Sequence, residues 1–284
     1  MAIEGVLTAM VTPFAADGSL DEDAAARLMR HLLANGSDGY VLAGTTGEGA
    51  TLSDAEKRRL WEVGVAEAAG AATVIAGTGT YDTAHSVRLT REAAAVGVDA
   101  VLVVTPYYLR PNRRGILAHF TAVAEAAEIP VILYNIPSRC AIDLPNDLLE
   151  ELAGIPNVVA VKQARYDDLA PIDGLDLLAG NDDMLADVLD LGGTGGILVA
   201  SHLAGREMRR MIDEPEARHE LHASLSDLFE ALSVTTNPMP VKAALRLAGH
   251  EVGSFRLPLV EPSEEELSVI RVALERRGLL AVPA

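Results

Sequence analysis

Residues 99–106 read DAVLVVTP, residues 130–135 read PVILYN and residues 157–162 read NVVAVK, three short apolar runs that end in polar residues. Runs that are apolar throughout, rather than alternating with polar residues, are typical of strands covered on both faces. Amphipathic segments over residues 113–127 and 145–153 separate these runs. This alternation of strand and helix predicts a parallel sheet.

The same alternation extends along the chain in both directions. Predicted helices include residues 21–36, a segment that begins at Ser53 with Glu56 in a capping box, and residues 82–96. Eight strand–helix units favour a closed (β/α)8 TIM barrel, an α/β fold, over an open doubly wound sheet. The five further predicted strands are GVLTAMV (5–11), DGYVLAG (38–44), TVIAGTG (73–79), LDLLAG (175–180) and GGILVAS (195–201).

The last part of the chain carries only helical patterns. No linker rich in Ser, Pro or Gly interrupts the first part, so we expect one barrel domain over residues 1–213. We expect residues 214–284 to form a C-terminal helical extension packed on the barrel. Its three patterns are PEARHELHASLSDLFEAL (215–232), PVKAALRLAG (240–249) and SEEELSVIRVALERRG (263–278).

Composition excludes several classes of protein. Of 284 residues, 49% are hydrophobic, which is too many for a disordered chain, and the one cysteine, Cys140, allows no disulfide within the chain. The 41 acidic residues outnumber the 23 basic ones, giving a net charge of −18 that disfavours nucleic acid and anionic membranes as partners. The N-terminus lacks a signal-peptide pattern, and no apolar run is long enough to span a bilayer. We therefore expect a soluble, cytoplasmic protein.

The polar residues at the predicted strand ends point to the chemistry, because the reacting groups of such barrels come from these ends and the loops after them. They include hydroxyls, tyrosines and one lysine, but no paired carboxylates or clustered histidines. This composition argues against glycosidase and metal-hydrolase chemistry. His219 and His222 lie on a predicted amphipathic helix without a third ligand, and we interpret them as solvated surface.

Lys162 is the main candidate for a reactive group. The chain has only three lysines against twenty arginines, and Lys162 ends the apolar run 158–161. Desolvation at the mouth of a barrel disfavours the ammonium and leaves an amine that can form a Schiff base with a carbonyl substrate. The alternative is a lysine that snorkels to the rim or pairs with a carboxylate, and the strand pattern alone does not decide between the two.

Two other strand ends could serve the same chemistry. Tyr134 could move protons during imine formation, or it could be a rim tyrosine whose ring packs while its hydroxyl meets water. The segment GTTGEG (44–49) could direct backbone N–H groups at an anion. Because no Gly-Lys-Ser/Thr follows, a substrate carboxylate fits this segment better than a phosphate.

Together, these motifs give the chain a family resemblance. It resembles the dihydrodipicolinate synthase/N-acetylneuraminate lyase family of Schiff-base aldolases over residues 4–280. The motifs are GTTGE (44–48), VTPYYLRP (104–111), YNIPSR (134–139), VK (161–162) and NPMPVK (237–242). The resemblance implies a (β/α)8 barrel with a C-terminal helical region.

The resemblance also implies catalytic roles. Lys162 would form a covalent imine with pyruvate, with no cofactor and no metal. Tyr134 would pass protons to and from this intermediate. Thr46 would relay them to Tyr108, which comes from the neighbouring subunit of a tight dimer in this family. The implied assembly is a homotetramer, a dimer of tight dimers.

The remaining implied positions concern substrate binding. Thr45 and Thr46 would hold the pyruvate carboxylate, while Gly180 and Leu198 would line the pocket through their backbone carbonyls. Arg139 would receive the carboxylate of a second substrate, since a guanidinium matches a carboxylate fork. Arg139 and the GTTGE motif both favour the synthase branch, which condenses pyruvate with aspartate-4-semialdehyde to 4-hydroxy-tetrahydrodipicolinate on the route to lysine and diaminopimelate.

Alternatives and departures from the family pattern remain. The chain could be another pyruvate-dependent aldolase or dehydratase, acting on a 2-keto-3-deoxy sugar acid or N-acetylneuraminate, or a catalytically silent binding barrel. The run QARYDD (163–168) lacks the glycine that commonly follows the lysine in synthases, in a loop that borders the pocket for the second substrate. His85 replaces a glutamate of the family's lysine-inhibition site, so we predict weak or absent feedback by L-lysine. The matching positions are Gly49, Asp54, Lys57, Tyr81 and His85.

Overall fold

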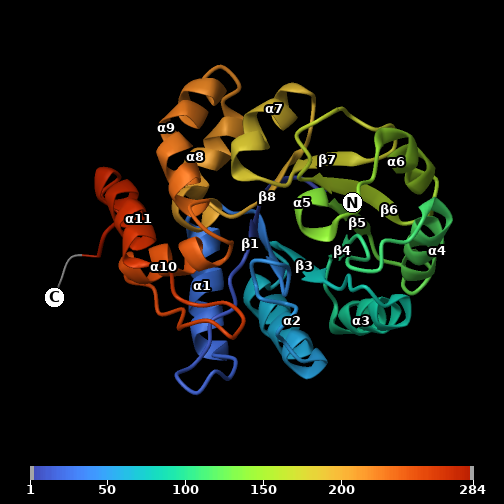
Figure 1. Cartoon of the computed structure of the whole chain (residues 1–284), viewed down its shortest axis with the longest axis horizontal. Coiled ribbons are helices and arrows are strands. Elements are labelled where there is room, and N and C mark those ends of the chain that lie inside the picture. Colours follow the sequence, from blue (N-terminus) through green and yellow to red (C-terminus); the bar gives the residue numbers. More distant parts are fainter. Residues whose placement is uncertain (1–2, 282–284) are drawn as a thin grey trace.

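A computed structural model, which describes residues 3–281, shows a closed barrel of eight parallel strands surrounded by helices (Figure 1). Each strand pairs with its neighbours in chain order, and β1 pairs with β8 to close the ring. The strands are β1 (Gly5–Ala9), β2 (Gly39–Leu42), β3 (Thr73–Gly77), β4 (Ala100–Val104), β5 (Val131–Asn135), β6 (Val158–Gln163), β7 (Asp176–Ala179) and β8 (Gly195–Leu198).

Four of the seven helices around the barrel begin at a residue whose side chain caps the helix. Asp21, Asp82 and Asn112 cap three helices through their side chains, and Ser53 and Glu56 form the predicted capping box of α2. These helices cover the outer face of the strands. They are α1 (Glu22–Ala34), α2 (Asp54–Ala68), α3 (Thr83–Val96), α4 (Arg113–Ala124), α6 (Asn146–Ala153), α7 (Leu185–Asp190) and α8 (Ser201–Asp213).

The eight predicted strands and the closed barrel are confirmed. Two short elements at the strand ends were not predicted: α5 (Pro137–Cys140) after β5, and the 3-10 helix η1 (Asp182–Met184) after β7. Both are too short to show a helical period, so the sequence pattern cannot reveal them. Both lie at the carboxyl ends of the strands and contribute to the site described below.

The C-terminal part of the chain is helical, as predicted, and lies along one side of the barrel (Figure 1, orange to red). It comprises α9 (Arg218–Leu232), α10 (Met239–Leu247) and α11 (Glu264–Arg276). Helix α9 packs on α8 and also contacts η1, so this region reaches the carboxyl ends of the strands. The division into a barrel domain and a helical extension at residue 213 stays a prediction. Within residues 3–281, no helix is both long and apolar enough to cross a membrane.

Candidate active site

Lys162 and Tyr134 face each other on adjacent strands. They are register partners between β6 and β5, and the Lys162 Nζ lies 4.1 Å from the centroid of the Tyr134 ring. Both side chains are 5% exposed. The parallel sheet brings the two strand ends together, and the apolar strands bury most of the lysine side chain.

The environment of Lys162 favours its neutral form. Burial lowers the pKa of its ammonium to about 7, the nearby Asp182 carboxylate opposes this shift, and the Arg139 guanidinium adds to it. A lysine with this pKa presents a substantial fraction of free amine at neutral pH. The alternative of a rim lysine in contact with water does not fit this geometry.

A cavity of about 380 Å³ opens over the Lys162 amine. It brings together six of the eight predicted site residues: Thr45, Thr46, Tyr134, Arg139, Lys162 and Gly180. Leu198 does not line it, because its side chain is fully buried and the next residue, Val199, forms the wall. Tyr108 lies outside the cavity and is 87% exposed, so it does not reach this chain's own Lys162.

The two threonines of GTTGE act on different residues. The Thr46 hydroxyl accepts a hydrogen bond from the Asn237 side-chain amide at 3.0 Å. Burial raises the pKa of the Tyr134 phenol, while the Arg139 guanidinium and, to a smaller extent, the Thr45 side chain lower it. Thr45 is therefore the threonine whose side chain acts on Tyr134, and the proton relay through Thr46 stays a prediction.

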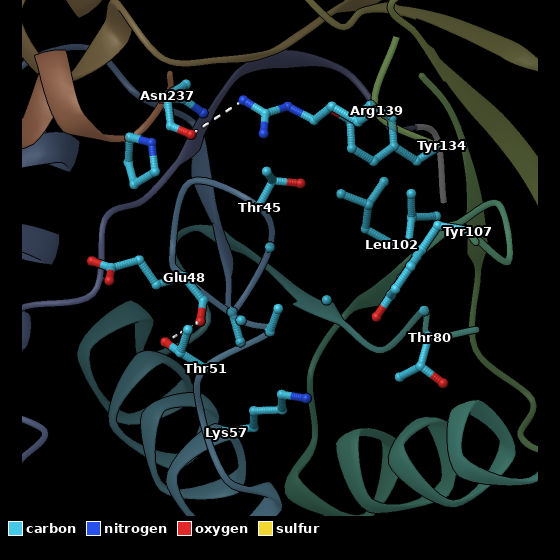
Figure 2. A pocket seen from close by; sticks show the side chains of 18 of the residues that line it. Thr45, Glu48, Thr51, Lys57, Thr80, Leu102, Tyr107, Tyr134, Arg139 and Asn237 are labelled. Atoms are coloured by element: carbon cyan, nitrogen blue, oxygen red, sulfur yellow. Dashed lines mark hydrogen bonds between the residues drawn. The ribbon is translucent and has the colours of Figure 1, made fainter. Parts of the chain in front are cut away.

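Arg139 sits between two cavities. Its Nη2 donates to the Asn237 carbonyl at 3.1 Å, a bond drawn in Figure 2. Together with Thr45, Tyr134 and Asn237, it lines both the Lys162 cavity and a second cavity of about 280 Å³. The guanidinium is thus available to an anion in the Lys162 cavity and is oriented by a residue of the C-terminal region.

The second cavity contains a buried lysine. Figure 2 shows the Lys57 ammonium pointing into it, with the Tyr107 hydroxyl turned toward the same space. Burial lowers the pKa of Lys57. The nearby Asp54 carboxylate is engaged by His85 Nε2, at 2.8 Å.

A buried ion pair fixes the loop that carries the two threonines. Lys242 Nζ on α10 donates to Glu48 Oε1 and to the Thr12 carbonyl, both at 2.8 Å, and the Lys242 and Glu48 side chains are fully buried. The other Glu48 oxygen accepts from the Arg256 backbone N–H at 3.1 Å. The motifs GTTGE and NPMPVK, which are distant in sequence, therefore meet in one contact.

The atypical run after Lys162 is held by polar contacts. The Gln163 side-chain oxygen accepts from Asn135 Nδ2 at 3.0 Å, and Arg165 Nη2 donates to Asn146 Oδ1 at 2.7 Å. The Tyr166 hydroxyl donates to the Asp183 carboxylate at 3.0 Å. Tyr166 and Asp183 both line the Lys162 cavity, so this run borders the space for a second substrate.

Helix α9 forms a wall of the Lys162 cavity that the sequence analysis did not predict. The sequence predicts His222 as solvated surface, but it lines this cavity, and its Nδ1 is buried without a hydrogen-bond partner within residues 3–281. The docking of α9 beside η1 brings His222 inward, which the amphipathic pattern alone does not specify. The α9 segment also contributes Ser226, Phe229, Glu230, Leu232 and Ser233 to the lining.

Comparison with known proteins gives matches over nearly the whole chain. The sequence model of the dihydrodipicolinate synthetase family matches residues 2–277. The 4-hydroxy-tetrahydrodipicolinate synthases of Mycolicibacterium paratuberculosis and Desulforamulus reducens are 46% and 44% identical, over 97% of this chain and 95% and 97% of theirs. A dihydrodipicolinate synthase from Cyanidioschyzon merolae, solved with lysine bound, superposes with a TM-score of 0.92 at 41% identity, covering 98% of this chain and 99% of that one.

The buried ion pair leads to a prediction about stability. We expect Lys242→Met alone, or Glu48→Gln alone, to reduce the free energy of unfolding by about 3–5 kcal/mol, because removing one partner leaves the other buried and unpaired. The double variant should lose less than the two single losses added together. Urea denaturation of the four proteins checks this. Strictly additive losses would contradict a direct interaction between the two side chains.

Proposed function

Because the chain belongs to the dihydrodipicolinate synthetase family, we propose that it condenses pyruvate with L-aspartate-4-semialdehyde to give 4-hydroxy-tetrahydrodipicolinate. The observation that carries this proposal is the buried amine of Lys162, with a pKa near neutrality, facing Tyr134 in a cavity that also contains Arg139. The curated relatives carry the name of this synthase, which supports it over the sugar-acid alternatives. The chain is accordingly a lyase.

The reaction begins at the nitrogen of Lys162. The neutral amine attacks the ketone carbon of pyruvate, and the resulting carbinolamine loses water to form a protonated imine. Loss of a methyl proton gives an enamine, whose carbon attacks the aldehyde of the second substrate. The amino group of that substrate then attacks the imine carbon, closes the ring and releases Lys162. The covalent imine activates pyruvate without a cofactor.

The remaining predicted residues assist these steps. Tyr134, with Thr45 beside it, transfers protons during formation and loss of the carbinolamine. The GTTGE loop holds the pyruvate carboxylate through Thr45 and Thr46, and the Gly180 carbonyl lines the pocket as the resemblance implies. Arg139 receives the carboxylate of the aldehyde substrate.

Tyr108 supports an assembly in which subunits share a site. Its ring is 87% exposed, and its backbone adopts a φ of 70°, a conformation that is uncommon outside glycine. We propose that Tyr108 completes the proton relay in a neighbouring subunit, within a homotetramer built as a dimer of tight dimers. We also propose that the enzyme serves lysine and diaminopimelate biosynthesis in the cytoplasm.

The choice of aldehyde is testable through Arg139. Wild-type protein should turn over pyruvate with aspartate-4-semialdehyde and should not cleave 2-keto-3-deoxygluconate or N-acetylneuraminate. Arg139→Ala should lower kcat/KM for the semialdehyde by about 100-fold, since a charge-assisted hydrogen bond of a few kcal/mol is lost. Arg114→Ala, at an exposed position on α4, is the matched control and should leave kcat/KM unchanged. Unchanged kcat/KM in Arg139→Ala, or faster cleavage of a sugar acid by the wild type, would contradict the proposed substrate.

Regulation by L-lysine should be weak or absent. The Lys57 ammonium points into the second cavity, where it would repel the amino groups of L-lysine, and His85 already engages the Asp54 carboxylate. We expect calorimetric titration with L-lysine to show no binding in the micromolar range. Micromolar affinity, lost in Lys57→Ala, would show that the family's inhibitor site is intact here.

A further inference from the structure

Asp182 is a carboxylate in the Lys162 cavity to which the mechanism above gives no role. It is the first residue of η1, which follows β7, the strand next to the one that carries Lys162. Its Oδ1 accepts hydrogen bonds from the backbone N–H groups of Val199, at 2.8 Å, and Ala200, at 3.0 Å. Among the residues that the structure describes, its Oδ2 has no hydrogen-bond partner. The carboxylate is therefore fixed by one oxygen and leaves the other available to the cavity.

The backbone that holds Asp182 is itself fixed by a buried histidine. His202 Nδ1 donates to the Val199 carbonyl at 2.8 Å, while its Nε2 accepts from the Val11 N–H at 3.1 Å. Burial lowers the pKa of His202 to about 4, so the ring is neutral at the pH of the cytoplasm. This chain of contacts joins the end of β1 to the loop after β8 and fixes the Val199–Ala200 peptide, whose N–H binds Asp182.

Among the charged groups that line the cavity, Asp182 is the carboxylate whose negative charge raises the pKa of Lys162. Tyr134 faces the amine from β5 and is neutral, and Arg139 on α5 is positive. The other ionisable groups of the cavity are Tyr166 after β6, Asp183 on η1, and His222 and Glu230 on α9. Tyr166 engages Asp183 with a hydrogen bond. The carboxylate of Asp182 therefore favours the charged form of the Lys162 amine.

We propose that Asp182 is a positioning residue that supplies the counter-charge for the Lys162 nitrogen, both as an ammonium and in the protonated imine with pyruvate. The part of this proposal that concerns the protonated imine rests on the proposed function. When the carbinolamine loses water, the nitrogen acquires a positive charge that the apolar barrel cannot solvate. A fixed carboxylate stabilises this charge without reorganisation, because its own orientation is set by the two backbone N–H groups. Asp182 exchanges no atom with the substrate.

The ionisation of Asp182 is suited to this role. Burial raises its pKa to about 6, while the hydrogen bonds from Ala200 and Val199 and the charge of Lys162 oppose that rise. The carboxylate is thus mostly ionised at neutral pH, but it takes up a proton at a higher pH than an exposed carboxylate does. Below pH 6 it gains a proton, and its support for the charged nitrogen is lost.

The test exploits the rarity of lysine in this chain, which has only Lys57, Lys162 and Lys242. Protein labelled with 13C at lysine Cε gives three signals, and Lys162→Arg identifies the one of interest. In Asp182→Asn the oxygen that binds the two backbone N–H groups is kept and only the charge is removed. We expect the midpoint of the Lys162 titration to move down by about one pH unit or more, the size of effect that a nearby opposite charge exerts.

A neighbouring carboxylate provides the matched control. Asp183→Asn removes an adjacent negative charge at an exposed position that Tyr166 engages, and it should leave the Lys162 midpoint within a few tenths of a pH unit. An unchanged midpoint in Asp182→Asn, or equal shifts in the two variants, would overturn the proposal. If Asp182→Asn does not fold, Asp182→Ser, which keeps an acceptor oxygen, carries the same expectation.

Addition of pyruvate to the labelled proteins separates this inference from the proposed function. In the wild type, the free-amine signal of Lys162 should be replaced by an imine signal. Asp182→Asn should need at least about tenfold more pyruvate at pH 7 for the same conversion, since the protonated imine loses its counter-charge. A wild type that forms no imine refutes the proposed function. A wild type and variant that convert equally refute the role of Asp182.

Discussion

The burial of a single amine among apolar strands is the constraint on which the site depends. Lys162 ends β6 inside the ring of strands, and removing its ammonium from water costs free energy that only nearby groups can offset. The Tyr134 ring at 4.1 Å and the Asp182 carboxylate in the same cavity offset part of it. The part of this cost that is not offset lowers the pKa of Lys162 to about 7, which makes the amine a nucleophile under neutral conditions.

The barrel and the C-terminal helices contribute differently to this site. The barrel places the strand ends side by side, so that Lys162 and Tyr134 meet through strand register alone. The C-terminal region then fixes the loops: Asn237 binds Thr46 and Arg139, and Lys242 binds Glu48 at the end of the GTTGE motif. Helix α9 closes one wall of the cavity. The helical extension is therefore part of the active site and not only a support for the barrel.

The sequence was sufficient for the barrel and for the residues at its strand ends. Eight apolar runs, each followed by a helical segment, predict the closed sheet because parallel strands are covered on both faces, and Lys162 and Tyr134 follow from their places at the ends of two runs. The pattern could not distinguish the partners of Thr45 and Thr46, because adjacent loop residues point in different directions. For the same reason, Leu198 is predicted in the cavity wall, whereas the structure has Val199 at this place. Asp182, Asn237 and His222 depend on contacts between distant segments, which no local periodicity records.

The central claim is that Lys162 forms an imine with pyruvate, and borohydride reduction tests it most directly. The folded protein is incubated with pyruvate and sodium borohydride at neutral to mildly alkaline pH, and intact-mass and peptide mass spectrometry then locate any adduct. The account predicts one reduced pyruvate adduct per chain, on the peptide that contains Lys162, and none in Lys162→Arg. No adduct in the wild type, or an adduct at Lys57 or Lys242 instead, would contradict it.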